Sequence, residues 1–296
     1  MKHELEKFFR SVESGGKSVT WQKAALVFGM SGNALRKRYK SWKNSKLGNG
    51  ERTSQDGTWV CIFDAHVPFQ NKKMFESINH LIQSIRPFGL VLGGDFLDLN
   101  SLSAHDRGKV PIPGLTLGKE YNEGNNVLDT LETYPFKRKV YLWGNHENRH
   151  NRYIKDSDNS KIRDAIRGPM EALNLIKRGY EVYENYPTDE FMLGDIKVYH
   201  GESFGQHCAY NDLQKIKKSV MFGHVHRQQS FHEREVEAHT IGSSADHTSP
   251  AFSYATRLQR QSWCNGLAIV TVINGKSFVE TVRYKHGKIV FGGKPY

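Results

Sequence analysis

Five short polar clusters, each placed directly after a short apolar run, most constrain how this chain can fold. In order they are Asp64-Ala65-His66, Gly94-Asp95-Phe96-Leu97-Asp98, Gly144-Asn145-His146-Glu147, His200-Gly201 and Gly223-His224-Val225-His226. Apolar runs of this length, bounded by turn residues, are typical of buried strands. Carboxylate, imidazole and carboxamide groups bind divalent transition metals. Their repetition at strand ends therefore predicts a two-metal site assembled from distant parts of the chain.

The apolar pattern predicts an α/β domain that begins at Thr58. Strands are expected at residues 59–63, 90–92, 139–143, 196–198 and 220–222, and an amphipathic helix at 74–85. A strand, a helix and a strand in succession indicate a parallel pair with a crossover helix. Residues 100–126 are expected to form an irregular loop beside the site, with helices at 126–133 and 160–177. Asn274-Gly275 predicts a hairpin between 267–273 and 277–283.

Hydropathy and cysteine content restrict the compartment. No run of about 18 apolar residues is present, so no membrane span is expected. The N-terminus lacks the apolar core of a secretory signal. Cys61, Cys208 and Cys264 lie far apart with no C-x-x-C spacing, which favours a reducing compartment. The expected location is the cytoplasm, which would be the host cytoplasm if a phage encodes the chain.

Positive charge is concentrated near the N-terminus. Residues 1–50 carry +8 of the net charge of +11, which indicates a polyanionic partner. Residues 20–42 predict a helix, a turn at Gly29 and a second helix capped by Ser31, with Leu35, Tyr39 and Trp42 on one buried stripe. The expected organisation is a basic module at 1–45, a linker at 46–57 and a catalytic domain at 58–296.

The predicted second helix resembles the recognition helix of a helix-turn-helix, which enters the DNA major groove. Nucleic acid, with DNA ahead of RNA, is therefore the expected partner. Its contacts are predicted at Arg36, Lys37, Lys40 and Lys43. The alternative is a small helical bundle that docks onto a protein and exposes its lysines to solvent.

The ordered motifs D-x-H, G-D-x-x-D, G-N-H-E, H-G and G-H-x-H resemble those of the calcineurin-like metallophosphoesterase superfamily over residues 58–296. Two further stretches, Trp263-Cys264-Asn265-Gly266 and Ser101-Leu102-Ser103, resemble its branch from bacteriophages and mobile elements. The resemblance implies a four-layer α/β/β/α metallophosphoesterase sandwich, here preceded by a small all-α helix-turn-helix-like domain.

The resemblance also implies the ligands of two metal ions. The first ion would be held by Asp64, His66, Asp95 and His226, and the second by Asp95, Asn145, His200 and His224, with Asp95 bridging. This mixture of nitrogen and oxygen donors suits Mn²⁺, with Fe or Zn²⁺ as alternatives, better than Ca²⁺.

The mechanism implied is phosphoester hydrolysis by a metal-bridging hydroxide, with Asp95 and His146 as the catalytic residues. His146 would be the general acid that protonates the leaving oxygen. Asp98 or Glu147 is expected to orient a histidine. Arg149 and Arg152 are expected to contact the substrate phosphate, and a surface salt bridge is the alternative for Arg149.

The leading hypothesis is a nuclease-like phosphodiesterase that the basic module brings to nucleic acid. One alternative is a phosphomonoesterase acting on a small molecule or a phosphoprotein. Protein phosphatases of the superfamily carry an arginine-glycine after the last aspartate of the second motif, where this chain has Leu99-Asn100, which weakens this alternative. Glu147 after His146 resembles the protein phosphatases and favours it. Another alternative is a DNA-binding or assembly protein that uses the fold as a scaffold. The oligomeric state stays open, with a homo-oligomer as one option.

Overall fold

The computed structural model describes residues 55–104, 112–157 and 165–296, and in the N-terminal region Leu5, Phe8, Phe9, 27–32, 34–36, Arg38 and Tyr39. The chain divides into two compact units, Met1–Ser54 and Gln55–Tyr296. Within the described residues, no helix combines the length and apolar character that a membrane crossing requires.

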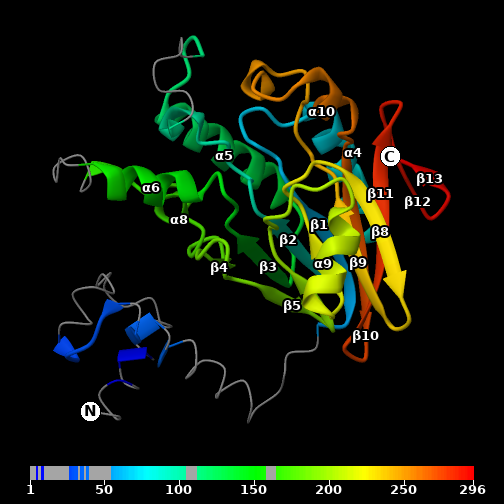
Figure 1. Cartoon of the computed structure of the whole chain (residues 1–296), viewed down its shortest axis with the longest axis horizontal. Coiled ribbons are helices and arrows are strands. Elements are labelled where there is room, and N and C mark those ends of the chain that lie inside the picture. Colours follow the sequence, from blue (N-terminus) through cyan, green and yellow to red (C-terminus); the bar gives the residue numbers. More distant parts are fainter. Residues whose placement is uncertain are drawn as a thin grey trace. The chain divides into compact units, whose positions relative to one another are not determined.

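Two mixed sheets form the Gln55–Tyr296 unit (Figure 1). The larger sheet has the order β13 (Lys294–Pro295), β12 (Lys288–Phe291), β11 (Lys276–Lys285), β10 (Gly266–Ile273), β1 (Gly57–Ile62), β2 (Gly89–Gly93), β3 (Arg138–Leu142) and β4 (Tyr180–Tyr183). The smaller sheet has the order β5 (Phe191–Leu193), β6 (Ile196–Val198), β7 (Val220–Phe222), β9 (Val236–Ile241) and β8 (Gln228–Glu233). Strands β1 to β4 are mutually parallel, as are β6, β7 and β9.

Alternation along β1 shows how the layers form. Trp59, Cys61 and Phe63 point into the core between the two sheets, together with apolar residues of β5, β6 and β7. Val60 and Ile62 point the other way, into a second core built with α4 (Lys72–Ile85) and α5 (Leu117–Leu131). Successive residues of a strand face opposite sides, so a strand buried on both faces reads as a continuous apolar run.

The smaller sheet is covered on its outer face by α9 (Cys208–Ile216), whose Cys208, Ala209 and Leu213 pack against Val220, Phe222 and Ala238. The remaining short helices are α6 (Asn148–Asp156), α8 (Pro169–Ala172), α10 (Arg257–Gln261), η1 (Asn100–Leu102) and η3 (Pro250–Phe252). The result is an α/β fold with helices outside two facing sheets, as expected.

The predicted strands and the hairpin are confirmed. Each of the five strands that precedes a polar cluster is present, and β1, α4 and β2 form the expected parallel pair with a crossover helix. Asn71 caps α4 by accepting a hydrogen bond from the Met74 amide. Asn274 and Gly275 join β10 to β11 with φ values of 51° and 73°, which asparagine and glycine tolerate better than other residues.

The predicted loop at 100–126 is wrong in its second half, because α5 already begins at Leu117 after the Thr116 cap. The buried face of α5 includes Glu120 and Gly124, which hide its apolar periodicity in the sequence. Gly124 is needed there, because a Cβ would lie 2.8 Å from the Leu97 side chain. Residues 105–111 of the predicted loop lie outside the described residues.

The helix predicted at 160–177 is also largely wrong. Residues 160–164 lie outside the described part, and the rest contains the four-residue helix α8 followed by turns. Pro169 occupies the first turn of α8, where its missing N–H costs nothing, and Asn174 adopts a positive φ of 53° beyond its end. Helix α6 was not expected, because none of its residues is buried and no apolar stripe marks it.

The described residues of the N-terminal unit contain a small apolar core of Leu5, Phe9 and Leu35. Gly29 has a φ of 62°, and the Ser31 hydroxyl accepts a hydrogen bond from the Ala34 amide at 3.2 Å, as the predicted turn and cap require. The helix-turn-helix assignment itself stays a prediction. Trp42 and the predicted contacts Lys37, Lys40 and Lys43 lie outside the described residues.

Candidate metal centre

Strained backbone marks the edge of the sheets where the polar clusters lie. Asp64, His66, Asp95, His224 and His226 follow β1, β2 or β7, and their φ values are 51°, 50°, 49°, 69° and 54°. Residues with side chains seldom adopt such values, and each instance costs on the order of 1–3 kcal/mol. Five instances at one edge mean that the surrounding fold fixes these side chains at the expense of stability, which is characteristic of a functional site.

The first group of donors joins the ends of β1 and β7. The Nε2 atoms of His66 and His226 lie 3.0 Å apart, and Asp64 Oδ1 lies 3.5 Å from Nε2 of His226 and 4.0 Å from Nε2 of His66. All three side chains are buried, and their donor atoms are close enough together to hold one metal ion.

The second group of donors joins the ends of β2, β3, β6 and β7. His200 Nε2 lies 3.2 Å from Asp95 Oδ2 and 3.1 Å from Asn145 Oδ1, which in turn lies 2.8 Å from His224 Nδ1. Asp95 Oδ2 is also 3.9 Å from His66 Nε2, so this carboxylate lies between the two groups. The fold thus brings together all seven side chains that were predicted as ligands.

Hydrogen bonds on the far side of two rings fix which nitrogen faces the site. His200 Nδ1 lies 3.1 Å from the Gly93 carbonyl oxygen, which can only accept, so Nδ1 carries the proton. His66 Nδ1 lies 3.0 Å from Asp98 Oδ2 and is protonated in the same way. The Nε2 atoms of both rings therefore point into the donor set, as metal ligation requires. This arrangement, and the facing Nε2 atoms of His66 and His226, fit a bound cation.

Asp98, rather than Glu147, orients the histidines. Its Oδ2 contacts Nδ1 of both His66 and His146, at 3.0 and 3.3 Å, and its Oδ1 accepts a hydrogen bond from Arg149 at 3.2 Å. The Asp98 backbone carbonyl accepts from His146 Nδ1 at 2.8 Å. One carboxylate therefore sets the ring orientation of a donor and of the predicted general acid.

Glu147 has another role that the sequence did not indicate. Its carboxylate accepts the backbone N–H groups of Asp95, Leu97 and Gly144, at 2.9–3.0 Å, and the Tyr141 hydroxyl at 3.0 Å. These bonds join the loop after β2 to the loop after β3. Glu147 therefore fixes the backbone that carries Asp95 and does not contact the donor histidines.

Burial and neighbouring charges shift the pKa values of the donors in different directions. Burial raises the pKa of Asp64 to about 6, and at His200 the carboxylates of Asp95 and Asp64 outweigh burial and raise the pKa to about 9. Burial lowers the pKa of His66 to about 4 and that of His226 to about 3, so both rings are neutral at pH 7. Burial opposes ionisation of Asp95, but the neighbouring His200 and His146 outweigh it and hold its pKa well below the ordinary value. A divalent cation binds neutral imidazoles, so its binding would displace the proton that the Asp95 and Asp64 carboxylates favour on His200.

His146 lies beside the donors, with Nε2 3.8 Å from Asp95 Oδ2. Its Nδ1 must donate to the Asp98 carbonyl, which leaves Nε2 as the atom that can gain or lose a proton. Arg149 Nη2 is 3.2 Å from this Nε2. Arg149 forms an ion pair with Asp98, as the alternative for this residue predicted. The pair lies inside the protein rather than on its surface. Arg152 donates to the Asn145 carbonyl at 3.0 Å.

Aromatic side chains around the donors were not predicted. Phe252 contacts the rings of His66 and His226, and Trp263 lies 4.6 Å from His226, measured between ring centroids. His247, to which the sequence assigned nothing, stacks on His226 at 5.7 Å, and Phe204 lies 4.5 Å from His224. These residues fall outside the ordered ligand motifs, so only Trp263, in the tail motif, carried a signal.

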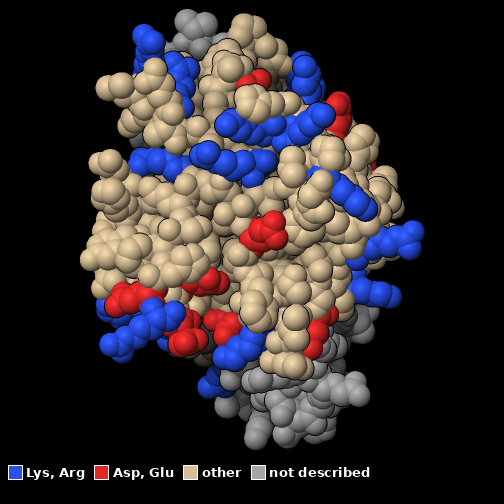
Figure 2. All heavy atoms as spheres, turned by 90° about the vertical axis from the view of Figure 1, so that its right-hand side faces the viewer, with Lys and Arg blue, Asp and Glu red and all other residues tan. Residues whose placement is uncertain are grey.

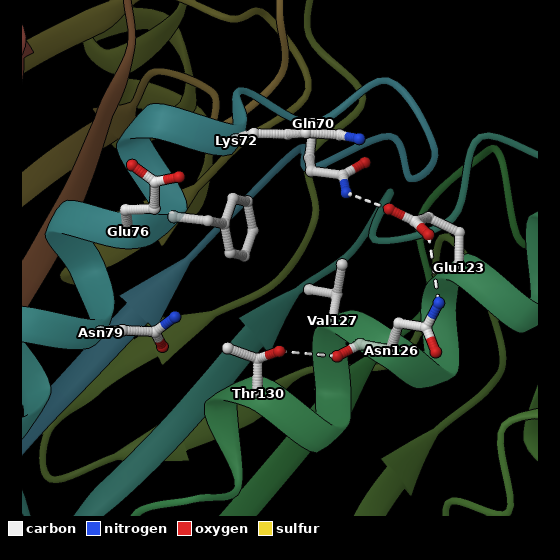
Figure 3. A pocket seen from close by; sticks show the side chains of 9 residues that line it. Gln70, Lys72, Glu76, Asn79, Glu123, Asn126, Val127 and Thr130 are labelled. Carbon is white, nitrogen blue, oxygen red and sulfur yellow. Dashed lines mark hydrogen bonds between the residues drawn. The ribbon is translucent and has the colours of Figure 1, made fainter.

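A cavity of about 180 Å³ between α4 and α5 is separate from the donor set. Its lining includes Glu76 and Asn79 from α4 and Asn126 from α5, and the Glu123 carboxylate accepts hydrogen bonds from Gln70 and Asn126 (Figure 3). None of the predicted ligands or catalytic residues lines it, so it is not the centre described above.

The fold and the donor set together define an α/β protein with a buried His/Asp site that fits two metal ions. No family model matches the sequence, and no curated protein matches it. The chain is similar to solved structures, one being zinc-bound wild-type Vps29 from Entamoeba histolytica, at 12% identity over 81% of this chain and 96% of that one, with a TM-score of 0.38.

Two other solved structures are also similar. An uncharacterized protein of Streptococcus pneumoniae, described as a predicted phosphoesterase, is 12% identical over 76% of this chain and 98% of that one, with a TM-score of 0.30. The nuclease MPE of Pseudomonas putida is 12% identical over 75% and 87% of the two chains, with a TM-score of 0.31. Likenesses at this level carry no argument about activity, which must come from the residues themselves.

Proposed function

We propose that this chain is a two-metal-dependent phosphodiesterase of the calcineurin-like superfamily that acts on nucleic acid. The observation that carries the proposal is the position of Asp95 Oδ2, within 4 Å of donor nitrogens from both groups and of the His146 ring. A carboxylate shared by two donor groups, with an acid–base histidine beside it, is the arrangement that hydrolysis of a phosphoester requires.

The proposed ligands are Asp64, His66 and His226 for one ion and Asn145, His200 and His224 for the other, with Asp95 shared. Two divalent ions in this set would activate water and neutralise charge on phosphoryl oxygens. The donors hold nitrogen and oxygen atoms and no thiolate, which suits Mn²⁺, Fe or Zn²⁺. We favour Mn²⁺ as the ion to test first.

The protein itself supplies the proton for the leaving oxygen. Burial and Arg149 oppose protonation of His146, but the carboxylates of Asp95 and Asp98 outweigh them and raise its pKa. Because Nδ1 is committed to the Asp98 carbonyl, the proton available for transfer is on Nε2. Arg149, next to this atom, is placed to bind a phosphoryl oxygen of the substrate once its hydrogen bond to His146 is released.

Charge supports a polyanionic substrate. The first 50 residues carry most of the net positive charge of the chain. On one face of the Gln55–Tyr296 unit, Lys and Arg side chains gather in bands across the upper half, whereas Asp and Glu side chains are mixed with Lys and Arg lower down (Figure 2). A chain with many phosphates gains affinity from several such contacts at once. Glu147, which the sequence linked to monoesterases, accepts hydrogen bonds from three backbone amides and the Tyr141 hydroxyl and gives no preference for a monoester.

Hydrolysis by the purified chain in Mn²⁺ tests the proposal. The substrates are bis-p-nitrophenyl phosphate, p-nitrophenyl phosphate and labelled single- and double-stranded DNA, and Asp95→Asn is the inactive control. Cleavage of the diester and of DNA, lost in the control, is the expected result. Turnover of the monoester alone would instead identify a phosphomonoesterase. Binding of two ions without turnover of any substrate would favour a scaffold role.

A further inference from the structure

Two large aromatic side chains are exposed beside the metal centre, and neither contributes much to the apolar core. Phe204 is 75% exposed and Tyr254 is 61% exposed. Burial of such rings is among the largest stabilising contributions a residue can make, so an aromatic ring held in solvent at a site edge calls for a ligand-based explanation.

The first ring lies beside the second donor group. Phe204 contacts His224 edge to face, with ring centroids 4.5 Å apart. Its backbone is fixed at several points, because Arg227 donates to the carbonyls of Phe204 and Gly205, and Gln229 donates to the Gln206 carbonyl. Ser203 is also hydrogen bonded to Asp212. The exposure of Phe204 is therefore imposed by an anchored loop.

The second ring lies beside the first donor group. Tyr254 contacts Phe252, which is fully buried against His66 and His226, with a Phe252–Tyr254 centroid distance of 6.4 Å. Phe252 thus places the exposed Tyr254 ring on the side of the centre that holds the first donor group.

We infer that Phe204 and Tyr254 are stacking platforms for the nucleobases on either side of the scissile phosphate, and that the substrate is single-stranded nucleic acid or a frayed end. This inference rests on the proposed function. A phosphate held at the metals places one neighbouring nucleoside near each donor group, and each donor group carries one exposed ring. Only unpaired bases offer both faces for stacking, and stacking on aromatic side chains tolerates any base sequence.

Alanine variants of the two rings, tested on two oligonucleotides, separate stacking from chemistry. The probes are a single-stranded DNA and the same strand with abasic residues flanking the cleaved phosphate. Phe204→Ala and Tyr254→Ala are each expected to raise KM for the ordinary strand about 5- to 100-fold, the range of one base–aromatic stack. The loss on the abasic strand is expected to be several-fold smaller. Tyr254→Phe, which keeps the ring, should restore binding.

The matched control is Phe278→Ala, which removes a 60% exposed ring on β11. This variant should leave KM unchanged for both strands. If the alanine variants raise KM equally for both strands, or leave KM for the ordinary strand unchanged, the stacking inference is overturned. A 2-aminopurine base next to the cleavage position gives a signal independent of turnover. If the parent protein quenches 2-aminopurine fluorescence and both alanine variants abolish this quenching, stacking is supported even without hydrolysis. If the parent protein hydrolyses the strand without such quenching, stacking is refuted and the nuclease proposal still stands.

Discussion

His66 and His226 are 160 positions apart in the chain, yet their Nε2 atoms lie 3.0 Å apart in the buried centre. His66 carries its proton on Nδ1, because this atom donates a hydrogen bond to the Asp98 carboxylate. Its Nε2 lone pair therefore faces the second ring. Both rings resist protonation because they are buried. A divalent cation held by these two residues would relieve this unfavourable contact, so we expect metal binding to be coupled to folding.

Metal removal should therefore destabilise the protein. At an Mn²⁺ concentration about 100 times its dissociation constant, binding adds about 2.7 kcal/mol to the free energy of unfolding. For a domain of this size, that corresponds to a rise in Tm of about 5–10 °C over the chelated form. Thermal unfolding with a chelator and with added Mn²⁺ measures the shift. His226→Ala should show a much smaller shift, and an unchanged Tm in the parent protein would contradict the coupling.

Gly144→Ala should abolish metal binding through contact with Asp95. A Cβ at Gly144 would lie 2.1 Å from Asp95 Oδ1 and 2.6 Å from the Asp95 amide nitrogen, so the carboxylate must move. Calorimetric titration with Mn²⁺ should show the affinity reduced by at least about 100-fold, the scale for a disturbed ligand environment. The matched control is Gly118→Ala on α5, where a Cβ meets nothing and stability should rise by about 0.5–1 kcal/mol.

His146→Asn should reduce turnover while the metals stay bound. General acid catalysis contributes about 10²- to 10⁴-fold, so kcat on DNA should fall by that range. The fall should be smaller on bis-p-nitrophenyl phosphate, because nitrophenolate leaves readily without a proton. Steady-state kinetics on both substrates, with metal content measured in parallel, gives the comparison. Equal losses on the two substrates would show that His146 does not protonate the leaving oxygen.

Glu120 should make stability depend on pH. Its carboxylate is fully buried and accepts the amides of Asn100 and Ser101, and burial raises its pKa to about 7. The folded state then binds the proton more tightly than the unfolded state, whose carboxyl has a pKa near 4.5. Its contribution to stability is complete below about pH 4.5 and is lost as the pH rises through about 7.

Urea unfolding of the parent protein and of Glu120→Gln between pH 5 and 8 checks this dependence. The glutamine cannot titrate, so the unfolding free energy of the parent, relative to that of the variant, should decrease over this interval. The control is Glu235→Gln, in an exposed turn. Its unfolding free energy should change with pH in the same way as that of the parent protein. A difference that does not vary with pH would show that Glu120 has an ordinary pKa.

The sequence alone determined the strands, their order along the chain and the side chains that gather at their ends. A buried strand ends where its apolar run ends, and this is a local property that composition and period reveal. Neighbouring parallel strands expose their carboxyl ends at one edge of a sheet, so Asp64, Asp95 and Asn145 had to meet once β1, β2 and β3 were parallel. The assignment of seven ligands came from the resemblance of the ordered motifs to those of the metallophosphoesterase superfamily.

Only the tertiary structure decided what surrounds those ligands. Asp98 and Glu147 are both acidic residues close to a donor, but Asp98 faces two imidazoles and Glu147 faces three backbone amides. Phe204 contacts His224, and Tyr254 contacts Phe252 beside His66 and His226, and both come from segments without a ligand motif. Side-chain direction and proximity across long sequence separations arise from packing of the whole chain, so no local pattern records them.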